Sequence, residues 1–262
     1  MIIDIHAHCF PDELAAKAIP FLEQKSGVTA YANGTIKGLK DSMTKAGVHT
    51  SVLQPVATKP NQTVSINRWA VSVQDESIIS FGTIHPEYAG WKEEIKFLMG
   101  AGVKGIKFHP NHQEFFIDDP KIFPIYEKIF ESGFIVLFHM GLDLWSMTGD
   151  RSTPERLVTI LKAFPGATII AAHMGGYRYW DDVEKYLIGT DLYLDTAYSF
   201  EELGTNRMER IIRQHGTDRI LFATDSPWTN PAVEISHIWS LGLSEEEIKK
   251  ILGGNARCLL CL

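Results

Sequence analysis

The sequence IIDIHAH over residues 2–8 is a short, mostly apolar run that ends in two histidines. Seven more runs of this kind follow it. They cover residues 51–57, 78–85, 103–109, 134–140, 168–174, 192–198 and 219–225. Near-continuous apolar runs of this length are typical of strands that are buried on both faces of a parallel sheet. The sequence therefore predicts eight parallel strands.

Helix-like segments separate the runs. Ile36, Leu39 and Met43 lie at helical spacing, and Gly47 follows as a stop signal, so we expect a helix over 36–46. Further helices are expected over 93–101, 120–132, 154–164 and 201–215. The polar, glycine-containing segment 26–35 is expected to be a loop over one end of the strands.

The alternation of strands and helices predicts an α/β protein. Eight such units in 262 residues match the usual size of a (β/α)8 TIM barrel. No flexible linker or low-complexity tract divides the chain, so we expect one domain over residues 1–262. An open, doubly wound sheet is the alternative, but no GxGxxG or GxxxxGK[ST] motif follows any run, so its nucleotide-binding versions lack support.

The composition excludes several classes of protein. The net charge of −7 argues against binding to nucleic acid or an anionic membrane. No apolar run approaches the roughly 20 residues of a membrane span, and no signal peptide is visible, so we expect a cytoplasmic protein. Three cysteines are too few for a disulfide framework, and Cys258 and Cys261 are expected to pack a helical tail. A small-molecule substrate is the expected partner, and homo-oligomerisation is left open.

Polar residues recur at one position in these runs, namely the C-terminal end. They are His6, His8, His109, His139, His173 and Asp225. In a TIM barrel, the C-terminal ends of the strands carry the active site. We therefore expect these side chains to meet in one site.

His6 and His8 stand two residues apart, so on a strand they point to the same face and can reach one ion. The alternative is two unrelated histidines. Asp4 lies two residues before His6, so on a strand it points to the same face as the two histidines. It is either a hydrogen-bond partner of a ligand histidine or a buried carboxylate whose hydrogen bonds come from other groups. Three imidazoles and one carboxylate suit Zn²⁺, with Fe or Mn as alternatives. One of the strand-end histidines would then remain outside the set of four ligands. The ion would also have a position for a water molecule, whose pKa the metal lowers towards about 7.

Several motifs resemble the amidohydrolase superfamily of metal-dependent barrel enzymes, and its amidohydrolase-2 branch in particular. They are MIIDIHAHCFP at the start, GIKFHP over 105–110, AAHMGG over 171–176, FATDSPW over 222–228 and GGNARCLL over 253–260. Each motif alone is weak, but their order at strand ends is specific, and the resemblance extends from Asp4 to about Leu260. The branch includes hydrolases of amides, esters and lactones, and non-oxidative decarboxylases.

The resemblance implies roles for five residues. His6, His8, His139 and Asp225 match the metal ligands of the family. His173 matches the histidine that bonds the metal-bound water or the substrate, and Asp225 also takes the proton of that water. One divalent ion, with zinc favoured, is therefore the expected cofactor.

Lys107 introduces an alternative. In binuclear members a lysine on the fourth strand is carbamylated and bridges two metals, so Lys107, His139 and His173 offer a second metal site. We favour one metal, because the amidohydrolase-2 branch is mostly mononuclear. Otherwise Lys107 is a cation that balances a buried carboxylate, and His109 is a hydrogen-bonding residue under the loop 109–112.

Decarboxylases of the branch use an arginine to hold the substrate carboxylate. No arginine stands directly at a strand end here; Arg178 is the nearest, with Lys107 as a substitute. The absence of an arginine at a strand end favours the hydrolases over the decarboxylases. Lys107, His109 and Arg178 are the candidate substrate-binding residues. Trp145 either walls the pocket or packs a loop on the barrel rim.

The leading hypothesis is a metal-dependent hydrolase, in which a metal-activated water attacks a carbonyl of a small amide, ester or lactone. His173 and Asp225 are its catalytic residues. The alternative is a metal-dependent non-oxidative decarboxylase of an aromatic or unsaturated carboxylic acid. A third hypothesis, a metal-binding protein without turnover, fits poorly with a complete ligand set.

Overall fold

A computed structural model describes residues 1–262 as parallel strands that alternate with helices, which confirms the predicted α/β class. By their contacts the residues form two compact units. Unit 1 comprises residues 1–53, 75–79 and 194–262. Unit 2 comprises residues 54–74 and 80–193.

Unit 1 is built on strands from both ends of the chain. They are β1 (Ile3–Ala7), β2 (Thr50–Leu53), β3 (Ile78–Ser80, whose last residue is counted with unit 2), β8 (Tyr193–Asp195, whose first residue is counted with unit 2) and β9 (Ile220–Leu221). Strand β1 pairs in parallel with β2, whose other neighbour is β3, and β8 pairs in parallel with β9. The backbone N–H of Ile5 donates to the carbonyl of Phe222 at 3.0 Å, and Ala7 forms a parallel bridge with Ser226. The chain that follows β9 therefore runs directly beside β1.

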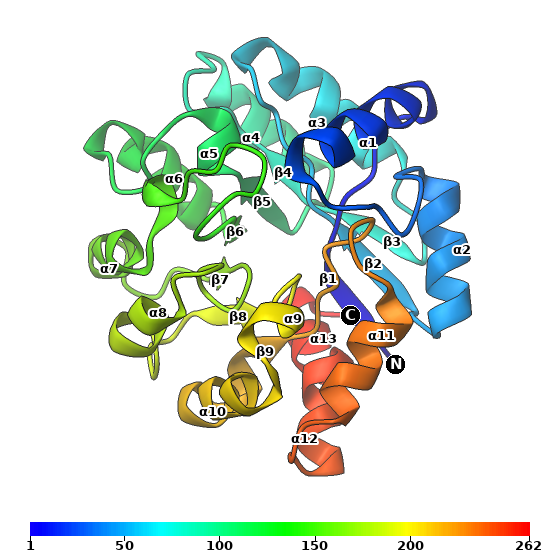
Figure 1. The fold of residues 1–262 in the computed structure, drawn as a ribbon. Helices are drawn as coiled ribbons and strands as arrows, with labels where there is room; N and C mark the ends of the chain where they lie inside the picture. The colour runs from blue at the N-terminus through cyan, green and yellow to red at the C-terminus, as the bar shows by residue number, and fades with distance from the viewer. The chain divides into compact units, whose positions relative to one another are not determined.

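The helices of unit 1 pack around these strands. They are α1 (Asp12–Ser26), α2 (Ile36–Ala46), α9 (Phe200–Leu203), α10 (Thr205–His215), α11 (Pro231–Trp239), α12 (Glu245–Lys249) and α13 (Asn255–Leu260), with the 3₁₀ turn η4 (Thr217–Arg219) and the π-helical turn η5 (Lys250–Gly254). Helix α2 begins at the cap Thr35, whose hydroxyl accepts the N–H of Gly38, and ends at Gly47 with φ 75°, as predicted. Helix α11 lies beside α2, and α13 lies beside β1 (Figure 1).

Unit 2 holds four parallel strands in sequence order. They are β4 (Gly82–Thr83), β5 (Gly105–Phe108), β6 (Ile135–Phe138) and β7 (Ile169–Ala171). Its helices are α3 (Thr63–Ser72), α4 (Trp91–Gly100), α5 (Pro110–Gln113), α6 (Phe123–Glu131), α7 (Pro154–Ala163) and α8 (Trp180–Tyr186), with 3₁₀ turns η1 (Pro60–Gln62), η2 (Pro120–Ile122) and η3 (Asp150–Ser152). Helices α6 and α7 cover one face of β5–β7 (Figure 1).

An aromatic cluster joins the sheet of unit 2 to α6. The ring of Tyr126 lies edge-on to those of Phe108 and Phe138, at 5.5 and 5.6 Å between ring centroids. All three side chains are fully buried. Edge-to-face pairs of this kind contribute about 0.5–1.5 kcal/mol each beyond the buried area. The cluster therefore anchors the two strands whose ends carry His109 and His139.

The strands are shorter than the apolar runs that predicted them. The run 78–85 divides into β3 and β4, and the polar ends of the other runs leave their strands. The predicted helix over 201–215 breaks at Gly204, which has φ 72°. Helix α1, with Pro20 in its interior, was not predicted, and Cys258 and Cys261 are exposed rather than packed.

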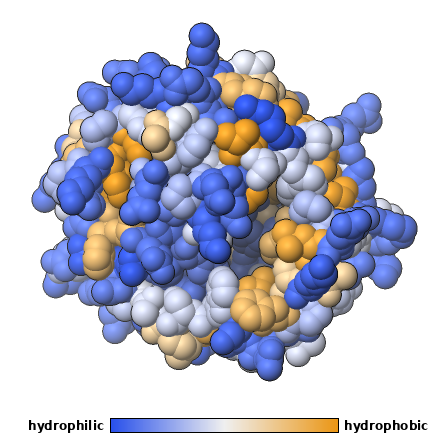
Figure 2. All heavy atoms as spheres, turned by 90° about the horizontal axis from the view of Figure 1, so that it is seen from above, coloured by the Kyte–Doolittle hydropathy of each residue, from blue (hydrophilic) through white to orange (hydrophobic).

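No helix is long and apolar enough to span a membrane. On the face that Figure 2 shows, hydrophobic residues form separate small patches within a hydrophilic surface. Dispersed patches of this kind are ordinary for a folded surface.

Candidate metal centre

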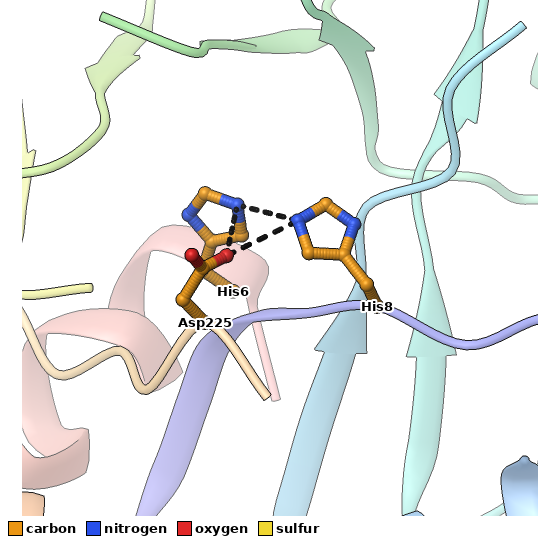
Figure 3. A group of neighbouring side chains, drawn as sticks. All are labelled: His6, His8 and Asp225. Carbon is orange, nitrogen blue, oxygen red and sulfur yellow. Dashed lines mark hydrogen bonds and ion pairs between the residues drawn. The ribbon is translucent and has the colours of Figure 1, made fainter. Parts of the chain in front are cut away.

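Three of the predicted ligands meet in unit 1 at the ends of β1 and β9. His6 is on β1 and His8 follows it, so both imidazoles leave the same face of the chain. Asp225 comes shortly after β9, and its backbone N–H donates to the carbonyl of His6 at 2.9 Å. This bond holds the carboxylate beside the two histidines (Figure 3).

The distances among these groups fit a single ion. The Nε2 atoms of His6 and His8 are 3.1 Å apart, and Oδ1 of Asp225 lies 3.5 and 3.2 Å from them. Two nitrogens bound to one tetrahedral zinc at about 2.0–2.1 Å are about 3.3 Å apart. The rings meet at 65°, so neither blocks the other from the ion. The arrangement supplies two nitrogen ligands and one oxygen ligand.

Two further carboxylates lie close to this group. Oδ2 of Asp195 is 2.9 Å from Nδ1 of His6, and both side chains are buried. Asp4 accepts the N–H groups of His6 and Thr224 and the hydroxyl of Thr224. The hydrogen bonds of Asp4 thus come from backbone and hydroxyl donors rather than from an imidazole. Of its two predicted roles, this is the buried carboxylate satisfied by other groups.

Burial is the main cause that raises the pKa of Asp4 to about 7; its hydrogen bonds lower the pKa, and the charge of Asp195 raises it. The site thus gathers Asp4, Asp195 and Asp225 beside two imidazoles. A divalent cation is the species that would balance such a concentration of carboxylates.

The backbone is strained at two of the predicted catalytic residues. Asp225 has φ 61° and His173 has φ 59°, both in the left-handed region that side chains rarely adopt. Left-handed backbone costs roughly 1–2 kcal/mol for a residue other than glycine. Strain of this kind gathers at functional sites, where the surrounding structure holds it in place.

The remaining predicted histidines, His109, His139 and His173, lie together in unit 2, where His112 joins them. The ring of His109 lies parallel to those of His112 and His139, at 3.8 and 4.0 Å between centroids. Nδ1 of His139 is 3.0 Å from Nε2 of His173. Burial, followed by the charge of His173, holds the pKa of His139 well below its usual range. A neutral imidazole is the form that binds a metal.

Nε2 of His139 is buried and has no hydrogen-bond partner, as expected of an atom that receives a ligand. His6, His8 and Asp225 belong to unit 1 and His139 to unit 2. The assignment of His139 to the same ion therefore stays a prediction from the sequence.

His109, His139 and Asp143 form a second group of close ligand atoms. The two rings differ in plane by only 13° and are stacked, so an ion in the plane of one ring lies outside the plane of the other. As they stand, these rings do not converge on one ion. Asp143 instead pairs with His112, with 3.2 Å from Oδ2 to Nε2. Burial alone would raise the pKa of Asp143, but the hydrogen bond and charge of His112 hold it well below its usual value.

The predicted substrate residues also lie in unit 2. Lys107 is fully buried on β5, and His109 follows the last residue of that strand. Trp145 is half-buried with its ring edge-on to His112. Arg178 is exposed, with its guanidinium 5.4 Å from the ring centroid of Tyr177. Their roles in binding stay predictions.

Asp195, His112 and Asp143 were not predicted from the sequence. Asp195 had a signal, because it ends the apolar core of the run 192–198 as Asp225 ends the last run. His112 and Asp143 lie in loops after strands, where no periodic pattern predicts side-chain direction.

A model of the Amidohydrolase family (Amidohydro_2) matches residues 3–262. The chain belongs to the amidohydrolase family. This confirms the resemblance that the strand-end motifs indicated. No curated protein sequence matches the chain significantly.

Solved structures match the amidohydrolase chain over its whole length. The 5-carboxyvanillate decarboxylase of Sphingomonas paucimobilis has a TM-score of 0.75 at 15% identity, covering 100% of this chain and 99% of that one. A dihydroxybenzoic acid decarboxylase of Polaromonas sp. JS666, solved with bound manganese, has 0.73 at 18% identity, covering 100% and 97%. An uncharacterised TIM-barrel protein of Bordetella bronchiseptica has 0.75 at 18%, covering 99% and 98%. These matches confirm the TIM-barrel fold.

Proposed function

We propose that this amidohydrolase-family enzyme catalyses the metal-dependent, non-oxidative decarboxylation of an aromatic or unsaturated carboxylic acid. The observation that carries the proposal is the convergence of His6, His8 and Asp225 on the position of one ion. Structures of the same fold that are named as decarboxylases support this reaction over hydrolysis. Of the two reactions that the sequence predicts, decarboxylation is thus the better supported.

A divalent ion held here would supply a Lewis acid that draws electron density from oxygen atoms of the substrate. His6 and His8 would hold it through Nε2, with Asp225 through Oδ1 and His139 as the predicted fourth ligand. A ligand set of two imidazole nitrogens and one carboxylate oxygen can bind zinc or manganese. Zinc stays our prediction from ligand type, and the manganese in a relative makes it the second ion to test.

Residues of the chain would supply the proton that the substrate carbon takes up. Breaking the bond between the carboxylate carbon and its neighbour releases CO₂ and leaves an electron pair on the substrate carbon, which then takes up one proton. Asp225 is the proposed donor, because its carboxyl is 14% exposed and can regain a proton from solvent. His173 would orient the substrate, and Lys107 and Arg178 would bind its carboxylate.

Product analysis tests the proposal. Metal-loaded protein is incubated with hydroxybenzoic and unsaturated acids labelled with ¹³C in the carboxylate, and labelled CO₂ is measured. We expect release of CO₂ that His8→Ala abolishes and that the control His49→Ala, an exposed histidine outside the site, retains. Absence of CO₂ from every acid, with turnover of an ester or lactone, would refute decarboxylation and favour the hydrolase.

Hydrolysis of an amide, ester or lactone stays the second candidate. The observation that favours it is the match to putative amidohydrolases of the same fold, such as one from Staphylococcus aureus with a TM-score of 0.74. The same ligand set would serve it, with Asp225 taking a proton from water instead of giving one to carbon.

A further inference from the structure

Asp195 is a buried carboxylate that neither the family motifs nor the proposed reaction uses. It ends β8 and lies in unit 1 with the metal centre. Strand β8 pairs with β9, and the chain after β9 runs beside β1, so the end of β8 comes close to His6. The side chains of Asp195 and His6 are 0% and 1% exposed.

We propose that Asp195 is a positioning residue for the metal centre, one that accepts the Nδ1–H of His6 and so leaves Nε2 unprotonated towards the ion. The proposal rests on the proposed metal-dependent function.

The geometry fixes which oxygen does this. Oδ2 of Asp195 is 2.9 Å from Nδ1 of His6. Oδ1 of the same carboxylate accepts the backbone N–H of Ala197 at 3.1 Å. With one oxygen held by the backbone, the other is directed at the imidazole, and the carboxylate has no freedom to turn away.

The protonation of His6 follows from this contact. An ionised carboxylate only accepts hydrogen bonds, so the proton of the neutral imidazole resides on Nδ1. Nε2 then carries the lone pair, and it is this atom that faces Nε2 of His8 and Oδ1 of Asp225. A histidine that gives its second ring proton to a carboxylate has a fixed tautomer and a more basic metal-binding nitrogen.

The competing explanation is purely structural, with Asp195 serving only to tie β8 to β1. The neighbouring residue offers a matched control for that role. Thr196 is buried, and its hydroxyl accepts the N–H of Ala223 and donates to the carbonyl of Ala223. Thr196→Val thus removes two buried hydrogen bonds at the same strand end without changing the carboxylate that contacts the imidazole.

The first test measures the affinity of full-length protein for Zn²⁺ and Mn²⁺ alone, by titration calorimetry against a competing chelator. Loss of such an outer partner typically weakens metal binding about 10–100-fold. We expect a loss of this size in Asp195→Ala and also in Asp195→Asn, because the single amide oxygen of asparagine cannot accept both the N–H of Ala197 and the Nδ1–H of His6. Thr196→Val should stay within about twofold of the wild type.

The second test needs no variant. In metal-free wild type, ¹⁵N NMR of the histidine rings should place the proton of His6 on Nδ1. A proton on Nε2 would overturn the proposal, as would an affinity of Asp195→Ala equal to that of Thr196→Val. If Asp195→Ala does not fold, Asp195→Asn and the wild-type spectrum still decide. A wild type that binds neither ion would refute the metal centre itself, while the spectrum would still report on the contact.

Discussion

The substitution Asp225→Asn tests the metal centre most directly. The amide keeps the shape of the side chain and one oxygen within reach of the ion, but it loses the negative charge. Oδ1 of Asp225 lies 3.2 and 3.5 Å from the two imidazole nitrogens, so it is one of three groups around the same position. Loss of a residue that only hydrogen-bonds a metal ligand lowers the metal affinity about 10–100-fold. Loss of the charge of Asp225, itself a ligand, should lower the affinity more.

The size of the effect follows from linkage between binding and folding, because only the folded chain brings these groups together. At a metal concentration about 100 times Kd, binding raises the free energy of unfolding by about 2.7 kcal/mol. At about 2–4 °C per kcal/mol, the wild type should gain about 5–11 °C in Tm. If Asp225→Asn weakens affinity about 100-fold, the same concentration gives about 0.4 kcal/mol, or about 1–2 °C.

The assay is thermal unfolding of metal-free protein with and without added Zn²⁺ or Mn²⁺. Asp41→Asn is the control, since this exposed carboxylate pairs only with Lys37 on the surface. Its metal response should equal that of the wild type. An Asp225→Asn variant with the full wild-type response would show that the carboxylate does not bind the ion.

The purified protein should hold one divalent ion per chain by elemental analysis; a value near two would instead support a second site bridged by Lys107. His6→Ala and His8→Ala should lose the ion, whereas His173→Ala should keep it and lose most turnover; equal loss of metal in His173→Ala would contradict the single-ion assignment. Burial raises the pKa of Glu234 to about 8. The folded chain therefore keeps this proton between about pH 4.5 and 8 while the unfolded chain releases it, so stability falls as pH rises through that window. In Glu234→Gln, the free energy of unfolding should therefore fall less between pH 5 and pH 8 than in the wild type, as measured by urea unfolding. An unchanged pH dependence would show that Glu234 does not contribute to the fall.

Much of the fold follows from local pattern. Each apolar run contains a strand, because burial on both faces demands apolar residues at every position. Helix α2 has the predicted bounds, since a threonine cap and a left-handed glycine define its ends locally. The division of the run 78–85 was not predictable, because its two halves pair with different neighbours, β2 and β5.

The site shows the same limit. Strand-end position and the spacing of His6 and His8 predicted the three groups that meet in unit 1. The contact between His6 and Asp195 joins residues 189 positions apart, so no local pattern encodes it. The stacking of His109 on His139 depends on ring orientation, which strand parity does not determine.

The closeness of the N-terminal and C-terminal segments in unit 1 has a consequence for how the metal is acquired. His6 and His8 are synthesised long before Asp225, and β1 gains β9 and α13 as neighbours only when most of the chain has been made. A nascent chain that presents the two histidines alone lacks the carboxylate that completes the three-ligand group. The three-ligand group is thus complete only once Asp225 has been synthesised and lies beside His6, and we expect a circular permutant that links the two ends beside β1 to load metal as the parent does.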